Sequence, residues 1–198
     1  MSDDVHAVLS TLNARRSVKL VAEPGPSEEQ VELALSVAAR APDHAKLRVW
    51  RFALIRQPHV SAVGEKAISI LDSLGKPMSV EKQASTRAWL KDVPLLVALA
   101  YQVHHDHPKV PELEQTLSMG AAVMGFQQAM HVMGFASYWS TGLATYADEM
   151  ADYLGFDTLD HRFVGFLSVG TPKNAVIPAQ RPDVWSIAKR WTPPNSKT

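Results

Sequence analysis

Runs of apolar residues and their spacing predict a chain in which helices alternate with short strands. Near the start, apolar residues at positions 5, 8, 9 and 12 fall on one face of a helix. The same pattern predicts the remaining elements in this order: a helix from Ser27 that ends before Pro42, a strand over 50–55, helices over 60–74 and 79–91, a strand over 94–101, a helix over 111–133, a strand over 136–139, a helix over 148–154 and a strand over 163–169. This order favours an α+β or α/β fold with a small sheet between helices.

In three of these segments the sequence also predicts where a helix begins or how deeply the element is buried. Ser27 is followed three residues later by Gln30, which is a capping-box pattern at a helix start. The strand over 94–101 is continuously apolar, as expected for a strand that is buried on both faces. The helix over 111–133 is apolar almost all round in its second half, so we expect it in the middle of a core or of a dimer interface.

The last 25 or so residues contain Trp185 and Trp191 and several prolines. A free tail seldom carries two tryptophans, because segments that stay disordered are poor in aromatic residues. We therefore expect this segment to be an extended arm that docks on another surface.

Charge and composition exclude several classes of protein. Twenty basic residues balance 20 acidic ones, and no long basic run is present, so we expect no nucleic-acid partner. There is no cysteine, which excludes disulfides and thiol catalysis and fits a cytoplasmic protein. The N-terminus lacks the apolar stretch of a signal peptide, and the apolar stretch over 119–133 is shorter than a membrane span. We expect a single domain over 1–198 that does not enter a membrane.

The first helix ends in Arg15, Arg16 and Ser17, followed closely by Lys19. A guanidinium is a planar set of donors that matches a phosphate, and a neighbouring hydroxyl adds one more donor. The motif therefore suggests a phosphate site. The alternative is that the two cations only complement the dipole at the end of the helix.

Two further segments are rich in groups that could face a polar heterocycle. Arg40, Asp43 and His44 surround a proline in the loop before the first long strand, where the alternative is a capped loop with surface charges. The strand over 136–139 leads into Trp139, Ser140 and Thr141, and a strand end of this kind often presents backbone amides to a ligand. The alternative there is an ordinary turn.

Four histidines invite a metal interpretation, which we do not favour. His104, His105 and His107 lie around Asp106 in a polar loop, but nothing in the sequence fixes them on one rigid face, so we expect a solvated loop and no metal. His131 lies in the apolar part of the long helix, where a core histidine is expected.

The chain lacks the motifs of several other chemistries. It has no GxGxxG after a strand, no phosphate-binding loop of the GxxxxGK[ST] type and no GxSxG turn. No pair of carboxylates stands out as an acid/base couple. A phosphate site without an evident catalytic side chain is best explained by a cofactor that carries the chemistry.

In this order and spacing, the segments resemble the nitroreductase family, and in particular its compact NAD(P)H nitroreductase type. The resemblance extends over about residues 5–173. It rests on the Arg-Arg-Ser helix end, on the Arg-Ala-Pro-Asp-His loop that leads to Trp50 and Phe52, on Ser118-Met-Gly-Ala-Ala-Val-Met-Gly-Phe-Gln127, on Gly134-Phe-Ala-Ser-Tyr-Trp139 and on Val164-Gly-Phe-Leu-Ser-Val-Gly-Thr-Pro172. The resemblance implies an α+β fold with a small central mixed sheet flanked by helices. It also implies an intertwined homodimer with a long central helix and a C-terminal arm that embraces the partner.

The resemblance also implies FMN as cofactor and assigns residues to it. Arg15, Arg16 and Ser17 would hold the phosphate and ribityl chain, whereas Arg40 and His44 would reach the flavin of the partner subunit. The residues beside the flavin ring would be Trp139, Ser140 and Thr141. Lys19 and Lys173 are weaker candidates for further cationic contacts.

The implied activity is that of an FMN-dependent oxidoreductase. It would take a hydride from NAD(P)H and reduce nitroaromatic, quinone or similar small-molecule acceptors in a ping-pong mechanism. Two alternatives remain open: a non-catalytic or partner-regulated flavin-binding protein, and a family offshoot that performs dehalogenation or flavin fragmentation.

The chain departs from the family pattern at four positions. Many members have Asn, Gln and Pro where this chain has Lys46, Arg48 and Val49, and compact relatives have Arg where it has Ser140. We expect these differences to alter which anion or substrate is accepted.

Overall fold

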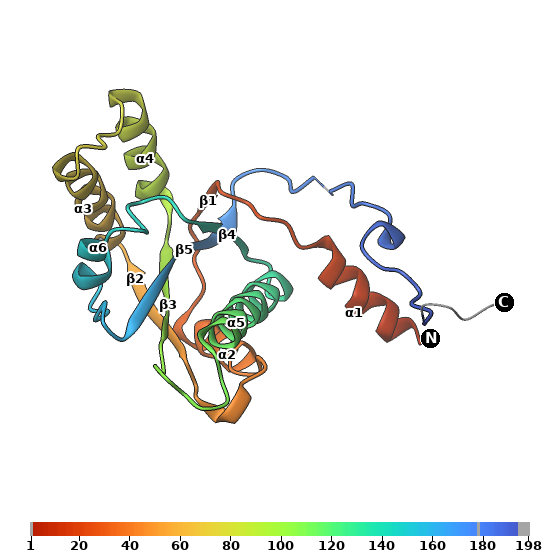
Figure 1. The fold of residues 1–198 in the computed structure, drawn as a ribbon. Helices are drawn as coiled ribbons and strands as arrows, with labels where there is room; N and C mark the ends of the chain where they lie inside the picture. Colours follow the sequence, from red (N-terminus) through yellow and green to blue (C-terminus); the bar gives the residue numbers. More distant parts are fainter. Residues whose placement is uncertain (1, 178, 194–198) are drawn as a thin grey trace.

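The computed structural model describes residues 2–177 and 179–193. A five-stranded sheet lies between two groups of helices, with α2 and α5 on one face and α3, α4 and α6 on the other (Figure 1). The helices and strands are α1 (Asp3–Ala14), β1 (Val21–Ala22), α2 (Glu28–Ala38), β2 (Trp50–Arg56), α3 (His59–Ser73), α4 (Val80–Asp92), β3 (Leu95–Gln102), α5 (Glu112–Val132), β4 (Ala136–Ser140), α6 (Asp148–Tyr153) and β5 (His161–Pro172), with short 3₁₀ turns at His44–Lys46 and Val184–Ser186. The predicted α+β class is confirmed.

The core divides into two apolar layers, one on each face of the sheet. Strand β3 lies at the centre of the order β1-β5-β3-β2, and its residues from Leu95 to Tyr101 are buried, as the continuous apolar run predicts. Leu96 and Phe166 belong to the layer under α3, α4 and α6, whereas Leu95 and Leu167 belong to the layer under α2 and α5. Alternation along each strand therefore supplies both layers.

The capping-box prediction is confirmed at the start of α2. The backbone N–H of Gln30 donates to Ser27 Oγ over 3.2 Å, and the Ser27 N–H donates to Gln30 Oε1 over 2.9 Å. The helix ends at Ala38, before the proline that the sequence sets as its limit. Both ends of α2 are thus set by local chemistry.

Strand β5 is longer than the predicted 163–169 because it pairs along its whole length. It contacts β3 on one side, and β4 and then β1 on the other. The two-residue strand β1 was not predicted, since a strand this short leaves no periodic signal. All pairs between the named strands are antiparallel, and the mixed character expected of the sheet is limited to one parallel bridge between Ser17 and Ser137.

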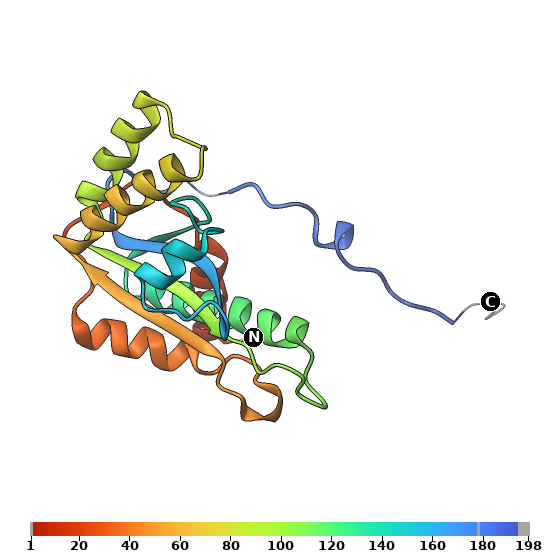
Figure 2. The same cartoon turned by 60° about the vertical axis from the view of Figure 1, so that its left-hand side comes forward.

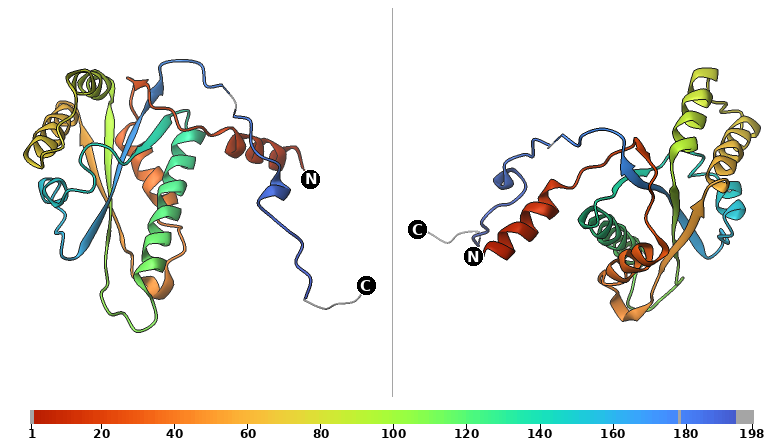
Figure 3. Two further views of the ribbon diagram at one scale, coloured as in Figure 1. Left: turned by 45° about the horizontal axis from the view of Figure 1, so that its top comes forward. Right: turned by 180° about the vertical axis from the view of Figure 1, so that it is seen from behind.

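Helix α1 and the C-terminal arm project from the same side of the molecule (Figure 3), and the arm extends far from the body (Figure 2). No residue of α1 is buried, and its stripe of apolar residues includes Val8, which is 58% exposed. In the arm, Trp185 and Trp191 are 58% and 71% exposed. Both tryptophans therefore stay largely exposed within one chain, although Arg181 of the arm contacts Arg15 at the end of α1; residues 178 and 194–198 of the arm lie outside the described part.

Helix α5 is buried on one face only, although its second half is apolar almost all round. Met119, Phe126 and Met130 are buried against the sheet and α2, whereas Met124 and Val132 are 46% and 62% exposed. Within the described residues, no helix is long and apolar enough to cross a membrane.

Candidate functional site

The Arg-Arg-Ser motif lies directly after α1, where three guanidinium groups gather. Arg181 of the arm donates from Nη2 to the backbone oxygen of Arg15 over 3.3 Å, so the arm and the motif are in contact. Burial lowers the pKa of Arg15, and the nearby charges of Arg181 and Arg16 lower it further. Among the described atoms, Arg15 Nη1 is buried and has no hydrogen-bond partner. This combination of a buried free donor and repelling cations is what an anion would relieve.

The chain leaves this cluster along the edge of β4. Ser17 forms a parallel bridge with Ser137, and the Val18 N–H donates to the Ser137 carbonyl over 3.0 Å. The buried side chain of Gln127 on α5 also donates to Ser137 Oγ, over 3.1 Å. The structure thus brings together two predicted segments that are about 120 residues apart in the chain.

The end of β4 is built from tight backbone geometry. Leu143 and Ala144 have φ values of 54° and 57° in the loop that follows, a conformation that is uncommon for residues other than glycine. On the neighbouring strand, Gly165 has a φ of 119°, and a Cβ there would lie 2.5 Å from the Ser140 carbonyl oxygen. Glycine is therefore required at 165 for the end of β4 to approach β5 this closely.

The three candidate residues at this strand end do not point the same way. Trp139 donates from Nε1 to the Val164 carbonyl over 3.0 Å and packs against the layer under α2 and α5. Ser140 and Thr141 instead line a cavity on the other face, where the Ser140 hydroxyl accepts from the Gly142 N–H over 3.2 Å. The structure therefore gives the Trp139 side chain a packing role and brings the other two to the cavity.

This cavity has a volume of about 500 Å³, which is in the range of small-molecule and cofactor sites. Its walls come from the end of α3, the α3–α4 connection, α4, the end of β4 and the loop after it: Lys19, Leu71, Leu74, Lys76, Met78, Lys82, Thr86, Trp89, Tyr138, Ser140, Thr141, Gly142, Leu143, Ala144, Thr145, Tyr146 and Ala147. Three lysines and three aromatic residues are among them. Sequence reasoning missed the α3–α4 wall, because its residues have no motif and become neighbours of β4 only through the fold.

Lys19 joins the cavity to the Arg-Arg-Ser segment. Its ammonium lies 4.7 Å from the centroid of the Trp89 ring, and its backbone oxygen accepts from Trp89 Nε1 over 3.1 Å. Burial lowers the pKa of Lys19, and the charge of Lys82 lowers it further. Lys19 is therefore a cavity residue, whereas the other loosely held candidate, Lys173, forms an ion pair with Asp92.

The loop over 40–48, which carries Arg40 and His44, leads into the start of β2 and lies away from β4 (Figure 1). His44 Nδ1 is 2.7 Å from Glu114 Oε2 on α5, and the Ser118 hydroxyl of the same helix donates to the Pro42 carbonyl over 2.6 Å. Within one chain the structure does not bring this loop together with Arg15–Ser17 or with the cavity. Its candidate residues are thus separated from the others within one chain.

The loop holds its shape through internal hydrogen bonds and strained backbone. The carboxylate of Asp43 accepts from the Arg48 N–H at 3.1 Å on each oxygen. Ala45, Lys46 and Arg48 have φ values of 59°, 58° and 51°. Such strain persists only where the surroundings fix it. Of the departures from the family pattern, Lys46 and Arg48 are exposed here, and Val49 is buried.

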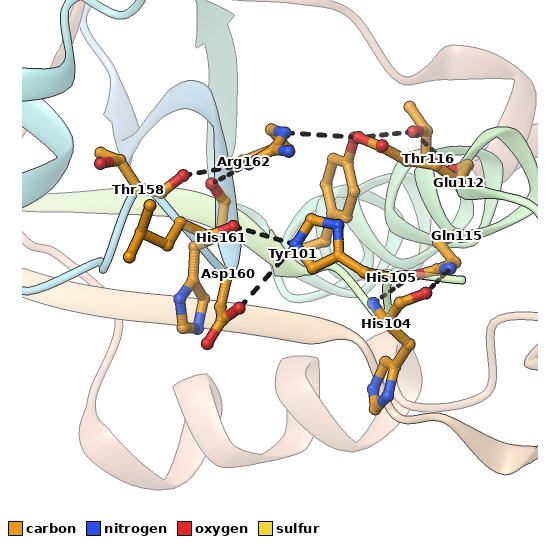
Figure 4. Close-up of polar contacts among 11 residues, drawn as sticks. Tyr101, His104, His105, Glu112, Gln115, Thr116, Thr158, Asp160, His161 and Arg162 are labelled. Atoms are coloured by element: carbon orange, nitrogen blue, oxygen red, sulfur yellow. Dashed lines mark hydrogen bonds and ion pairs between the residues drawn. The ribbon is translucent and has the colours of Figure 1, made fainter. Parts of the chain in front are cut away.

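The histidine-rich loop forms a polar cluster with the start of β5 (Figure 4). Gln115 Oε1 accepts from the His104 N–H over 2.9 Å, and His105 Nε2 lies 3.0 Å from the Leu159 carbonyl. His107 Nδ1 accepts from the Val110 N–H over 3.1 Å. These side chains fasten the loop, and in the described part of the chain no three His, Asp or Glu residues are arranged to hold a metal ion. His131 binds the Thr11 carbonyl over 2.9 Å and links α5 to α1.

Comparison with known proteins identifies the family to which this fold and these motifs belong. The family model described as "Nitroreductase family" matches residues 12–171. The protein named "Putative NAD(P)H nitroreductase YdjA" from Escherichia coli strain K12 is 34% identical over 168 residues, which cover 83% of this chain and 88% of that protein.

Solved structures show the same fold. The nitroreductase-like family protein from Bacillus cereus superposes with a TM-score of 0.76 at 17% identity, covering 93% of this chain and 95% of that one. A variant of the FMN and NADPH-dependent nitroreductase NfnB from Sphigopyxis sp. strain HMH superposes with a TM-score of 0.73 at 17% identity, covering 93% and 99%. The match of the family model to most of the chain agrees with the resemblance carried by its motifs, and the chain belongs to the nitroreductase family.

Proposed function

We propose that the protein is an FMN-dependent oxidoreductase that oxidises NAD(P)H and reduces nitroaromatic, quinone or similar acceptors. The observation that carries this proposal is the buried Arg15 Nη1, which lacks a partner in the described structure and lies in a cluster of like charges. A phosphate monoester supplies both the missing acceptor and the missing negative charge. The names of the relatives, which refer to NAD(P)H and in one case to FMN, support the same cofactors.

The residues present fit both the phosphate end and the ring end of FMN. Arg15, Arg16 and Ser17 would hold the phosphate and ribityl chain, with Arg181 as a further cation. The segment from Ser17 to Lys19 runs along β4 to the cavity, which is large enough for a flavin ring. Ser140 and Thr141 would face that ring, and the Trp89 indole offers an aromatic surface in the same wall.

In the proposed reaction the protein binds, orients and shields the reactants, and FMN, when bound, would supply the two-electron redox chemistry between NAD(P)H and the acceptor. Lys19 supplies a positive charge in the lining of the cavity, where it favours negative charge on a bound ring. The apolar side chains of Leu71, Leu74 and Met78 limit access of water from the α3 side. Because the donor and the acceptor use one cavity, we expect ping-pong kinetics.

We further propose that the active form is a homodimer. Apolar side chains remain exposed on three separate elements: Val8 on α1, Val132 on α5, and Trp185 and Trp191 on the arm. Apolar surface of this extent is typical of an interface. A second copy of the chain, packed on these elements, would bury their apolar side chains. It would also let Arg40 and His44 reach the flavin of the partner subunit, so that the two chains together complete one site.

Absorption spectroscopy of the purified protein tests this proposal. We expect a yellow protein whose flavin absorbance is bleached by NAD(P)H under anaerobic conditions and restored by a nitroaromatic or quinone. A colourless protein that does not take up added FMN would contradict the cofactor assignment. A yellow protein that NAD(P)H leaves unbleached would instead favour a flavin-binding protein without turnover, and steady-state kinetics that require a ternary complex would exclude the ping-pong scheme.

A further inference from the structure

The cavity beside β4 has an unbalanced charge. Lys19, Lys76 and Lys82 line it, and no aspartate or glutamate does. None of these three lysines takes part in an ion pair in the described structure, although several surface cations elsewhere do, among them Lys173 with Asp92. The cavity is thus a cationic pocket with an apolar and aromatic lining.

The lysines differ in position. Lys19 lies over the Trp89 ring, which lines the same cavity. Lys76 lies in the connection between α3 and α4, and Lys82 lies in the first turn of α4, so both belong to the wall that faces the loop after β4. Figure 3 shows this α3–α4 pair at one edge of the molecule. Lys76 and Lys82 are both exposed to solvent, so they form the rim of the cavity.

The neighbouring acidic groups lie outside the cavity lining. Glu81 precedes Lys82, but its carboxylate is held by its own backbone and by Ser79, which lowers its pKa, and Glu81 does not line the cavity. Glu65 of α3 is engaged by Arg87 over 2.7 Å. Lys82 itself acts on Lys19 as an uncompensated like charge. An anion bound between these lysines would remove that repulsion.

We propose that Lys76 and Lys82 select the electron acceptor by charge, so that the preferred acceptors are aromatic or quinoid molecules that carry a carboxylate or sulfonate group. This inference rests on the proposed function and makes its acceptor class specific. The flat apolar part of such a molecule fits the lining formed by Leu74, Met78 and Tyr138, and its anionic group meets the rim. Lysine suits this role, because its ammonium is a mobile point charge that accepts anions of different shape.

A matched pair of acceptors tests the proposal. We would compare 4-nitrobenzoate with its methyl ester in the parent enzyme, in the double variant Lys76→Gln/Lys82→Gln and in the control Lys91→Gln, which changes a lysine of the same helix outside the cavity. We expect kcat/KM for 4-nitrobenzoate to fall about tenfold in the double variant, and the value for the ester to change less than about twofold. The control should leave both values unchanged, and added salt should reduce the preference of the parent for the anion.

Two outcomes would overturn the proposal. One is an equal effect of the double variant on the acid and on the ester. The other is a loss confined to reduction of the enzyme by NAD(P)H, with reduction by the neutral N-benzyl-1,4-dihydronicotinamide unaffected; the rim would then bind the phosphates of the nucleotide.

Two further measurements keep this test separate from that of the proposed function. The flavin spectrum of each variant reports whether cofactor binding and bleaching persist. Calorimetric titration of the protein as purified with 4-nitrobenzoate and with the ester measures charge selection without turnover. Weaker binding of the acid alone in the double variant is the expected result, and equal binding of acid and ester by the parent would contradict the proposal.

Discussion

The Arg15 cluster and the loop over 40–48 both carry cations next to a predicted flavin contact, yet their polar groups are in opposite states. In the loop, Asp43 accepts two hydrogen bonds and His44 is paired with Glu114. In the cluster, Arg15 has a buried nitrogen without a partner in the described structure, and like charges surround it. Asp43 and His44 in the loop are thus paired within one chain, whereas the cluster offers a ligand a buried donor that is unpaired among the described atoms. Substitutions in the two regions should therefore differ in what they change.

The largest effect is expected from the double variant Arg15→Ala/Arg16→Ala. It removes two charge-assisted contacts to the phosphate, each worth roughly 1.5–3 kcal/mol, so FMN affinity should fall by about two to four orders of magnitude. Stability of the apoprotein should stay the same or rise slightly, since repulsion is relieved. Titration of apoprotein with FMN, followed by flavin fluorescence, measures the first quantity, and urea unfolding measures the second. A variant that purifies as yellow as the parent would contradict the phosphate assignment.

Asp43→Ala should lower the stability of the apoprotein and leave the binding of the FMN phosphate unchanged, which is the opposite of the result expected for the arginine variant. The variant loses both acceptors of the Arg48 N–H in a strained loop, so we expect the free energy of unfolding to fall by about 1–2 kcal/mol. Binding of the phosphate end of FMN should be unaffected in the monomer, because Asp43 bonds within its own loop and the structure shows no contact between that loop and Arg15 in the described chain. Urea unfolding of the apoprotein gives the first value. Asp43→Asn serves as the control, because it keeps one acceptor oxygen and should recover part of the stability.

A smaller effect is expected from Arg181→Gln in the arm. Arg181 adds charge to the cluster from an exposed position, so its loss should weaken FMN binding by about two- to fivefold, and less at high salt. The dependence of the FMN dissociation constant on salt concentration measures this contribution. If the salt dependence of the variant equals that of the parent, Arg181 makes no contact with the phosphate.

The smallest effect concerns the pKa of Lys19. Burial is the main reason that this pKa is lowered, and the charge of Lys82 is the second. Lys82→Gln removes only the second cause, so the pKa of Lys19 should rise but stay below its ordinary value. A pH titration of the lysine side-chain NMR signals measures the change. A pKa that falls in the variant would show that Lys82 does not act on Lys19 as a like charge.

Local patterns in the sequence were sufficient for most elements of the fold. The Ser27–Gln30 cap fixed the start of α2, and the continuous apolar run of β3 correctly indicated burial on both faces. The sequence could not indicate the length of β5, because that strand is extended by pairing with β1 and β4. Pairing between distant segments leaves no periodic signal in either of them.

The candidate site was predicted unevenly for the same reason. Arg15 and Ser17 form a compact motif, and the structure joins them to β4 as one continuous edge. Trp139 belonged to the same predicted set, but the alternation of side chains along β4 turns its indole away from the cavity that Ser140 lines. Motif spacing identified the right strand end, and the direction of each side chain became clear only in the folded sheet.

The sequence by itself determined the alternation of helices and strands, the capped start of α2, the cluster of cations after α1 and the family of the protein. Each of these depends on neighbouring residues or on the order of motifs along the chain. Tertiary structure alone decided that Arg181 approaches Arg15 and that Lys19, Lys76 and Lys82 share one cavity without a carboxylate. It also decided that the loop with His44 packs on α5, apart from the cavity. Interactions between charges depend on distance in space, and the distances between remote segments are set by sheet pairing and helix packing, which no local pattern encodes.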